Sequence, residues 1–129
     1  MKKILLAEGN PFLISIYTEQ LRKSGYSVSI VSSGELAISR ARKINPDLLI
    51  LDAGLPGGPK DSSGYSDGFS VLRELKEDLG FKDMKIVLLS NFEKEEEILN
   101  FTDFGALKYF KKAENTSEEI VEEIKKILS

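Results

Sequence analysis

Two acids, a hydroxyl and an ammonium follow apolar runs that lie far apart in the sequence. Glu8 comes directly after the first run, and Asp52 directly after the third. Ser90 follows the fourth run, and Lys112 follows the fifth. A carboxylate pair can hold Mg²⁺, and a hydroxyl with an ammonium can bind phosphoryl oxygens. Asp52 could also act as a nucleophile and form an aspartyl phosphate.

The apolar runs that position these residues are interpreted as strands, and they alternate with segments of helical spacing. The runs are Ile4–Ala7, Val28–Val31, Leu48–Leu51, Ile86–Leu89 and Ala106–Phe110. Two inner runs have no polar interruption, as expected of parallel strands covered on both faces. Strict alternation predicts an α/β fold, with a doubly wound, five-stranded parallel sheet and five helices.

The predicted helices are recognised by apolar stripes and by their start signals. The stripes are Phe12, Leu13, Ile16, Tyr17 and Leu21; Leu36, Ala37, Ala41 and Ile44; Phe69, Leu72, Leu75 and Leu79; Ile98, Leu99 and Thr102; and Ile120, Val121, Ile124, Ile127 and Leu128. Asn10 precedes a first-turn proline. Ser32 with Glu35, and Thr116 with Glu119, fit capping boxes.

Composition restricts the chemistry that this chain can perform. Its 129 residues predict one domain over 1–129. The absence of cysteine and histidine excludes disulfides, thiolate metal sites and a phosphohistidine on this chain. The 18 basic and 21 acidic residues give a net charge of −3, which does not suggest a nucleic-acid or membrane surface. An acid at Glu8 comes too early for a signal peptide, so we expect a cytoplasmic protein.

The candidate residues are expected to meet at one edge of the sheet. Open α/β sheets bind ligands beyond the carboxyl ends of their strands, where all four of these residues fall. We expect Lys112 to pair with Asp52 and Glu8 in the resting state, because an ammonium favours the charged form of nearby carboxylates.

Along its whole length the chain resembles the receiver domain of two-component response regulators, of the chemotaxis-regulator type. The matching segments are Lys3–Glu8; Pro46–Asp52 with Leu55–Gly57; Asp67–Phe69 with Val71 and Leu72; Ile86–Ser90; and Gly105 and Ala106 with Tyr109 and Lys112. The resemblance implies a flavodoxin-like fold with strand order 2-1-3-4-5. It also implies a phosphoprotein of phosphorelay signalling, and not an enzyme.

The resemblance assigns roles position by position. Asp52 is implied to be the phosphoacceptor, and Glu8, Asp52 and the carbonyl of Gly54 are implied to hold Mg²⁺. Ser90 and Lys112 are implied to contact the phosphoryl group.

The resemblance also implies a switch and two kinds of partner. Tyr109 is implied to be the aromatic residue that changes rotamer on activation. A histidine kinase or phosphotransfer protein would supply the phosphoryl group. Because Ser129 follows the last predicted helix directly, we expect a stand-alone receiver that signals to a separate effector.

The sequence departs from the family around the implied metal site. Gly9 stands where a second acid is usual, which removes a carboxylate ligand. Ala113 replaces the proline that usually follows the lysine, and nine residues, Gly58–Ser66, stand where the family has one. Asp61 or Asp67 in or beside this insertion could supply the missing carboxylate.

These departures leave two interpretations open. The chain could be a phosphorylatable receiver with an atypical metal site. Alternatively, it could be a phosphorylation-independent pseudo-receiver that acts as a protein-interaction module.

Overall fold

The computed structural model describes residues 1–59, 67–78, 81–91 and 100–129. Its strands are β1 (Lys3–Ala7), β2 (Ser27–Val31), β3 (Leu48–Asp52), β4 (Lys85–Ser90) and β5 (Lys108–Lys111). They form one sheet in the order β2-β1-β3-β4-β5, and every neighbouring pair is parallel. The doubly wound, flavodoxin-like fold class predicted from the sequence is confirmed.

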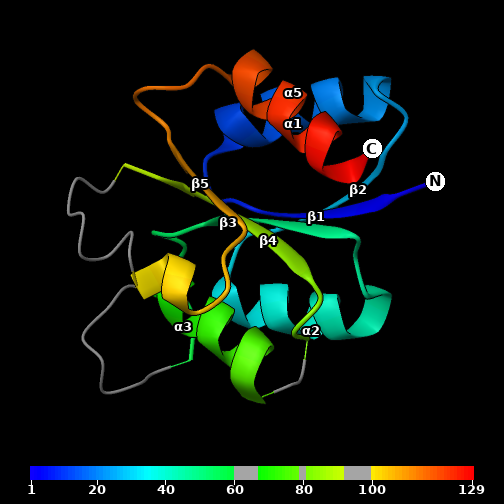
Figure 1. The fold of residues 1–129 in the computed structure, drawn as a ribbon. Helices are drawn as coiled ribbons and strands as arrows, with labels where there is room; N and C mark the ends of the chain where they lie inside the picture. The colour runs from blue at the N-terminus through cyan, green and yellow to red at the C-terminus, as the bar shows by residue number, and fades with distance from the viewer. Residues whose placement is uncertain (60–66, 79–80, 92–99) are drawn as a thin grey trace.

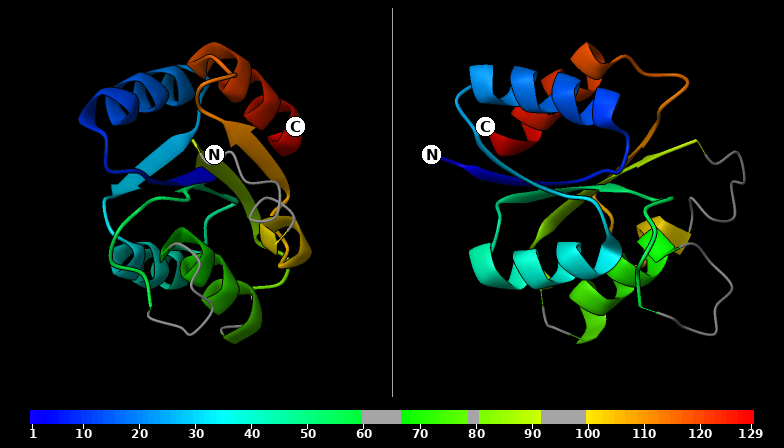
Figure 2. Two further views of the ribbon diagram at one scale, coloured as in Figure 1. Left: turned by 90° about the vertical axis from the view of Figure 1, so that its left-hand side faces the viewer. Right: turned by 180° about the vertical axis from the view of Figure 1, so that it is seen from behind.

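Helices cover both faces of this sheet. The described helices are α1 (Pro11–Lys23), α2 (Gly34–Ile44), α3 (Asp67–Arg73), its π-helical continuation η1 (Glu74–Asp78), and α5 (Ser117–Leu128). Helices α1 and α5 lie on one face, and α2 and α3 lie on the other (Figures 1 and 2). The fourth predicted stripe lies mostly outside the described residues, which resume in a helical stretch at 100–103.

The central strands are buried on both faces, which explains why they lack polar residues. Leu5 and Leu49 pack in the cluster under α2 and α3. Ile4 and Leu48 pack in the cluster under α1 and α5. All four side chains have no exposed surface, and burying each contributes roughly 1.5–3 kcal/mol. This rigid centre fixes the carboxyl ends of β1 and β3, where the candidate acids begin.

Two residues predicted to face the core are exposed instead. Phe12 is 72% exposed and Leu36 is 51% exposed. Each stands one residue before a position that packs on the core, namely the partly buried Leu13 in α1 and the buried Ala37 in α2. One residue along a helix turns a side chain by about 100°, so these two lie beside the buried stripe.

The starts of α1 and α5 match the sequence prediction, whereas the start of α2 differs from it. Asn10 accepts hydrogen bonds from the amides of the second and third residues of α1, at 2.9 and 3.2 Å. Thr116 and Glu119 form the predicted capping box. Ser33, and not Ser32, caps α2 by accepting from the amide of Leu36.

The shift at α2 has a tertiary cause. The amide of Gly34 donates to the carbonyl of Pro56 at 2.8 Å, and the amide of Glu35 donates to that of Gly57 at 2.9 Å. The loop after β3 thus satisfies the first amides of α2 and fixes where the helix begins.

Strand β5 begins at Lys108 instead of Ala106. The amide of Ala106 donates to the carbonyl of Phe101, which closes the turn after residues 100–103. Ala106 therefore belongs to the end of the preceding helical stretch.

Candidate phosphoryl-acceptor site

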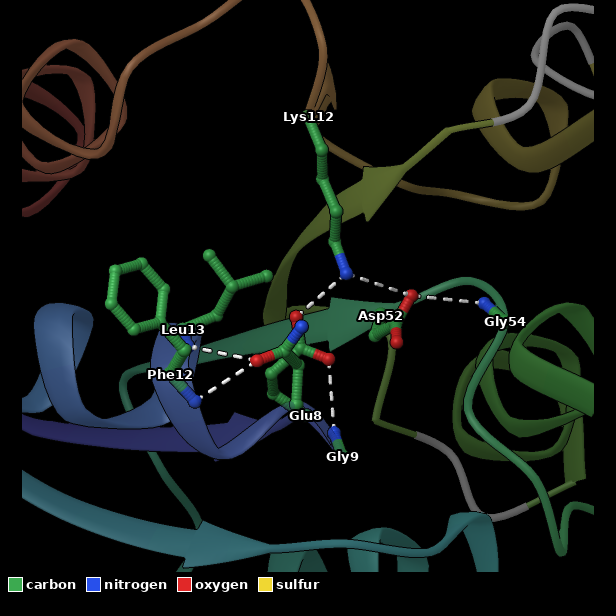
Figure 3. A network of polar contacts seen from close by, with 8 residues as sticks. Glu8, Gly9, Phe12, Leu13, Asp52, Gly54 and Lys112 are labelled. Carbon is green, nitrogen blue, oxygen red and sulfur yellow. Dashed lines mark hydrogen bonds and ion pairs between the residues drawn. The ribbon is translucent and has the colours of Figure 1, made fainter.

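The carboxyl ends of β1, β3 and β5 bring Glu8, Asp52 and Lys112 together (Figure 3). Glu8 follows β1, Asp52 is the last residue of β3, and Lys112 follows β5. Between them in the sheet, β4 ends at Ser90, whose carbonyl accepts from the amide of Lys112 at 2.8 Å. The convergence predicted from the sequence is confirmed.

Lys112 joins the two acids. Its Nζ lies 2.7 Å from Oε1 of Glu8 and 3.5 Å from Oδ1 of Asp52. The side chains of Lys112 and Asp52 are 15% and 18% exposed, whereas Glu8 is 1% exposed. The ion pair expected in the resting state is therefore present, and of its three residues Asp52 and Lys112 are the ones with exposed surface.

Glu8 is a buried carboxylate whose charge is held by two donors. Its Oε1 accepts from Lys112, and its Oε2 accepts from the amide of Gly9 at 2.9 Å. Burial raises the pKa of Glu8, the adjacent Asp52 carboxyl raises it further, and Lys112 lowers it. The pKa of Glu8 thus reflects a balance between burial and Asp52, which raise it, and Lys112, which lowers it.

Asp52 is oriented by its own loop. Its Oδ1 accepts from the amide of Gly54 at 3.0 Å, and its backbone pairs with Leu89 of β4. The next residue continues the ladder, because the amide of Ala53 donates to the carbonyl of Leu89. These bonds hold the carboxylate at the end of the sheet, where an incoming phosphoryl group could approach it.

Ser90 and Tyr109 occupy the positions that the sequence implies. Ser90 is 2% exposed at the end of β4, one residue beyond the partner of Asp52. Tyr109 lies in β5 opposite Leu88 and packs, partly buried, against the cluster under α2 and α3. Lys112 follows Tyr109 by three residues, so β5 links the polar cluster to this aromatic side chain.

Gly9 leaves a gap where a side chain would stand. A Cβ built on Gly9 would meet no atom within 4 Å. Asn10 does not fill the gap, because its side chain caps α1. Within the described ranges no cluster of three or more acids or other metal-binding side chains is found. Among the described residues, the carboxylates at this site are those of Glu8 and Asp52.

Asp67 does not supply the missing ligand. Its Oδ2 accepts from the amide of Gly57 at 2.9 Å, which ties the start of α3 to the loop after β3. Asp61, the other candidate, lies outside the described residues. No peptide bond in the described ranges is cis, and the Lys112–Ala113 bond is accordingly trans.

Close packing of glycines surrounds the loop that carries Asp52. A Cβ on Gly68 would lie 2.5 Å from the carbonyl oxygen of Ala53, and one on Gly58 would lie 2.4 Å from that of Asp67. A Cβ on Gly34 would lie 2.6 Å from Cα of Gly58. Real Cβ atoms do not approach so closely, so these three positions exclude larger residues. These three close contacts were not predicted from the sequence, in which the glycines themselves were the only signal.

Tyr17 is influenced by the charge of Glu8, which the sequence did not reveal. It is 2% exposed in the cluster under α1 and α5. Burial raises the pKa of Tyr17 to about 12, and the negative charge of Glu8 contributes to the shift. In the sequence Tyr17 was indistinguishable from the other apolar positions of its stripe.

A parallel, doubly wound sheet with an acid pair and a lysine at its carboxyl edge defines the class of receiver-type α/β proteins. Comparison with known families agrees: the response regulator receiver domain matches residues 4–125. The chain therefore belongs to the response regulator receiver domain family, whose members act in two-component signalling.

Relatives of known role extend beyond this chain. It is 30% identical over 126 residues to the transcriptional regulatory protein BaeR of Escherichia coli, covering 98% of this chain and 48% of that protein. It is 32% identical over 89 residues to the DNA-binding response regulator MtrA of Mycolicibacterium smegmatis, covering 69% and 34%. The chain thus spans about half or less of the length of these relatives.

Solved structures support the same fold. The receiver domain of the sensor histidine kinase PA1611 from Pseudomonas aeruginosa, with magnesium coordinated in its active-site cleft, is 25% identical. It superimposes with a TM-score of 0.78, covering 97% of this chain and 95% of that one. A CheY-like receiver protein from Methanospirillum hungatei superimposes with a TM-score of 0.83 at 20% identity, covering 99% of this chain and 94% of that one.

Among the described residues no helix has the length and apolarity needed to cross a membrane.

Proposed function

We propose that this domain accepts a phosphoryl group on Asp52 and uses it to switch a protein-interaction surface. The observation that carries the proposal is the position of Asp52 at the carboxyl edge of the sheet, partly exposed and 3.5 Å from the ammonium of Lys112. A carboxylate so placed is an accessible nucleophile with a cation beside it for the oxygens of the incoming group.

The reaction is a transfer between two nucleophiles. A carboxylate oxygen of Asp52 attacks the phosphorus of a phosphohistidine on a kinase or phosphotransfer protein, and the phosphorus–nitrogen bond breaks. The imidazole leaves with the bonding electron pair, and an aspartyl phosphate remains. Lys112 then turns from Asp52 to a phosphoryl oxygen, and the Ser90 hydroxyl hydrogen-bonds another. Their movement is expected to reach the surface around Tyr109.

Magnesium would be held by Glu8, Asp52 and the carbonyl of Gly54. When bound, it would supply charge neutralisation between the carboxylate and the phosphoryl group. Glu8 and Asp52 suit it chemically, because hard cations prefer oxygen ligands. Lys112 competes with this binding, since its ammonium already pairs with the same two carboxylates and offsets one of their two negative charges. We therefore expect a weaker magnesium site than one with an acid at position 9.

A second function is favoured by a separate observation. Lys112 already pairs with both acids and Gly9 supplies no third ligand, so one net negative charge is left to attract a metal ion. This arrangement supports a pseudo-receiver that binds a partner without phosphorylation. Under either function the separate effector and the cytoplasmic location stay predictions.

Intact-protein mass after incubation with acetyl phosphate distinguishes the two functions. The experiment is run with and without Mg²⁺ on the wild type and on Asp52→Asn. A magnesium-dependent gain of one phosphoryl group in the wild type alone supports the phosphoacceptor. No gain at any Mg²⁺ concentration contradicts it and favours the pseudo-receiver, provided that circular dichroism shows both proteins folded.

A further inference from the structure

The edge of the sheet carries a groove between β2 and α2 that shares no residue with the polar cluster. Strand β2 is an edge strand, so no further strand covers this side. The groove has a cavity volume of about 380 Å³. It is lined by Ile30, Val31, Leu36, Ser39, Arg40 and Lys43. Figure 2 shows the backbone of β2, in light blue, and of α2, in cyan.

Two of the side chains that line the groove are large, apolar and exposed to solvent. Ile30 is 38% exposed and Leu36 is 51% exposed. Both count among the few large apolar side chains exposed in the described part of the chain, and they line the same groove. Adjacent exposed apolar groups, rimmed by polar ones, mark interaction sites more often than isolated ones do.

The rim of the groove is basic although the protein is acidic. Helix α2 contains Arg40, Arg42 and Lys43 against the single acid Glu35, while the whole chain has a net charge of −3. Within the described ranges neither Arg40 nor Lys43 forms an ion pair or side-chain hydrogen bond. By contrast, Lys108 is paired with Glu123 at 2.7 Å. The two cations on the groove are therefore available to acids of another molecule.

The helix that carries the groove is bonded to the loop that follows Asp52. The amides of Gly34 and Glu35 donate to the carbonyls of Pro56 and Gly57. A shift of this loop must therefore move the start of α2 or break these bonds. The groove is thus placed where an event at Asp52 could reach it.

We propose that the β2–α2 groove binds an acidic amphipathic segment of a partner protein. Apolar side chains of that segment pack on Ile30 and Leu36, and its carboxylates pair with Arg40 and Lys43. A helix with apolar side chains on one face and acids beside them matches this pattern. The proposal does not depend on phosphorylation of Asp52, so each can fail without the other.

The test uses a defined probe on the full chain. The probe is a fluorescein-labelled helical peptide of Leu, Ala and Glu with leucines along one face, and its match carries Lys in place of Glu. We expect the acidic peptide to bind more tightly than the basic one, with NMR shifts confined to β2 and α2. The double variant Arg40→Glu with Lys43→Glu should lose about tenfold in affinity for the acidic peptide and gain affinity for the basic one.

Matched variants separate this site from general charge effects. Leu36→Ser should weaken binding of the acidic peptide without changing net charge. The double variant Lys125→Glu with Lys126→Glu on α5 should weaken it much less than the groove variant. All these side chains are exposed or only partly buried, so circular dichroism should show folded proteins.

Several results would overturn the assignment. These are equal affinity for both peptides, an equal loss in the α5 variant, shifts outside β2 and α2, or no saturable binding up to about 1 mM. Tighter binding of a single-stranded oligonucleotide than of the acidic peptide would also overturn it, because the groove would then recognise anionic charge alone.

Discussion

The ammonium of Lys112 lies 2.7 Å from Oε1 of Glu8, in a pair whose acid is 1% exposed. A buried carboxylate is costly unless a cation and hydrogen bonds compensate for its lost hydration. Lys112 provides that cation, and the amide of Gly9 provides the second bond. Any ligand that draws Lys112 away must therefore also compensate Glu8.

Removing the cation should destabilise the protein in a pH-dependent manner. Burial already raises the pKa of Glu8, and loss of the Lys112 contribution should raise it further. A raised pKa means that the folded state binds the proton more tightly, so stability falls as pH rises from the usual value of 4.5 through the folded value. Lys112→Gln should thus cost about 3 kcal/mol at neutral pH and less in acid.

Urea unfolding of the Lys112→Gln variant over a pH series measures this effect. The control is the double variant Glu8→Gln with Lys112→Gln, in which the extra pH dependence should disappear. A loss of the same size at every pH would show that Lys112 stabilises the fold by packing alone.

Restoring an acid at position 9 should strengthen the magnesium site. Gly9→Asp meets open space around the new Cβ, and its backbone does not require glycine. An added carboxylate should raise Mg²⁺ affinity by at least about tenfold and speed labelling by acetyl phosphate. Isothermal titration with Mg²⁺ gives the affinity, and Gly9→Asn is the neutral control. Equal affinities for the Asp and Asn variants would mean that position 9 does not reach the cation.

Tyr17 should report the charge of Glu8. Its pKa is raised to about 12, first by burial and then by the Glu8 carboxylate. Because the folded pKa exceeds the usual value of 10, Tyr17 contributes stability below pH 10 that is lost as the pH rises toward 12. In a titration of phenolate absorbance, Glu8→Gln should shift the last tyrosine to lower pH. Tyr17→Phe should abolish that step, and persistence of the step would assign it to another tyrosine.

The contact between Gly68 and Ala53 should tolerate no added methyl group. A Cβ on Gly68 would stand 2.5 Å from the Ala53 carbonyl oxygen, directly after Asp52. Gly68→Ala should therefore lower the free energy of unfolding by about 1–3 kcal/mol through overpacking. Chemical denaturation measures it, and Gly9→Ala, with open space around its Cβ, is the matched control. Equal stability of the two variants would show that α3 can shift without cost.

The sequence was sufficient to predict those features of the fold that depend on local residue patterns. Unbroken apolar runs predicted the buried strands, and Asp52 was located because a polar residue ended such a run. Local pattern could not show which of two adjacent serines caps a helix. Ser33 caps α2 instead of Ser32 because the distant Pro56 and Gly57 fix its first amides.

Other features of the site depend on distances that only the fold creates. Leu36 and Ala37 are adjacent apolar residues, and only the orientation of α2 on the sheet decides which one is buried. Pairing of Lys112 with both Asp52 and Glu8 was predicted from the sequence. The sequence did not indicate that Lys112 lies nearer to Glu8, at 2.7 Å against 3.5 Å, or that Glu8 is the more buried acid.

The junction of Gly57 and Gly58 with Asp67 has a consequence for how this domain can vary in length. The amide of Gly57 donates to the Asp67 carboxylate, and Gly58 packs against the Asp67 carbonyl, so described residues on either side of 60–66 contact each other. Lengthening a segment whose ends already meet adds only a slowly growing entropy cost. A reporter peptide grafted between residues 59 and 67 should therefore leave Asp52 in place, which makes this position suited to carrying a label beside the site.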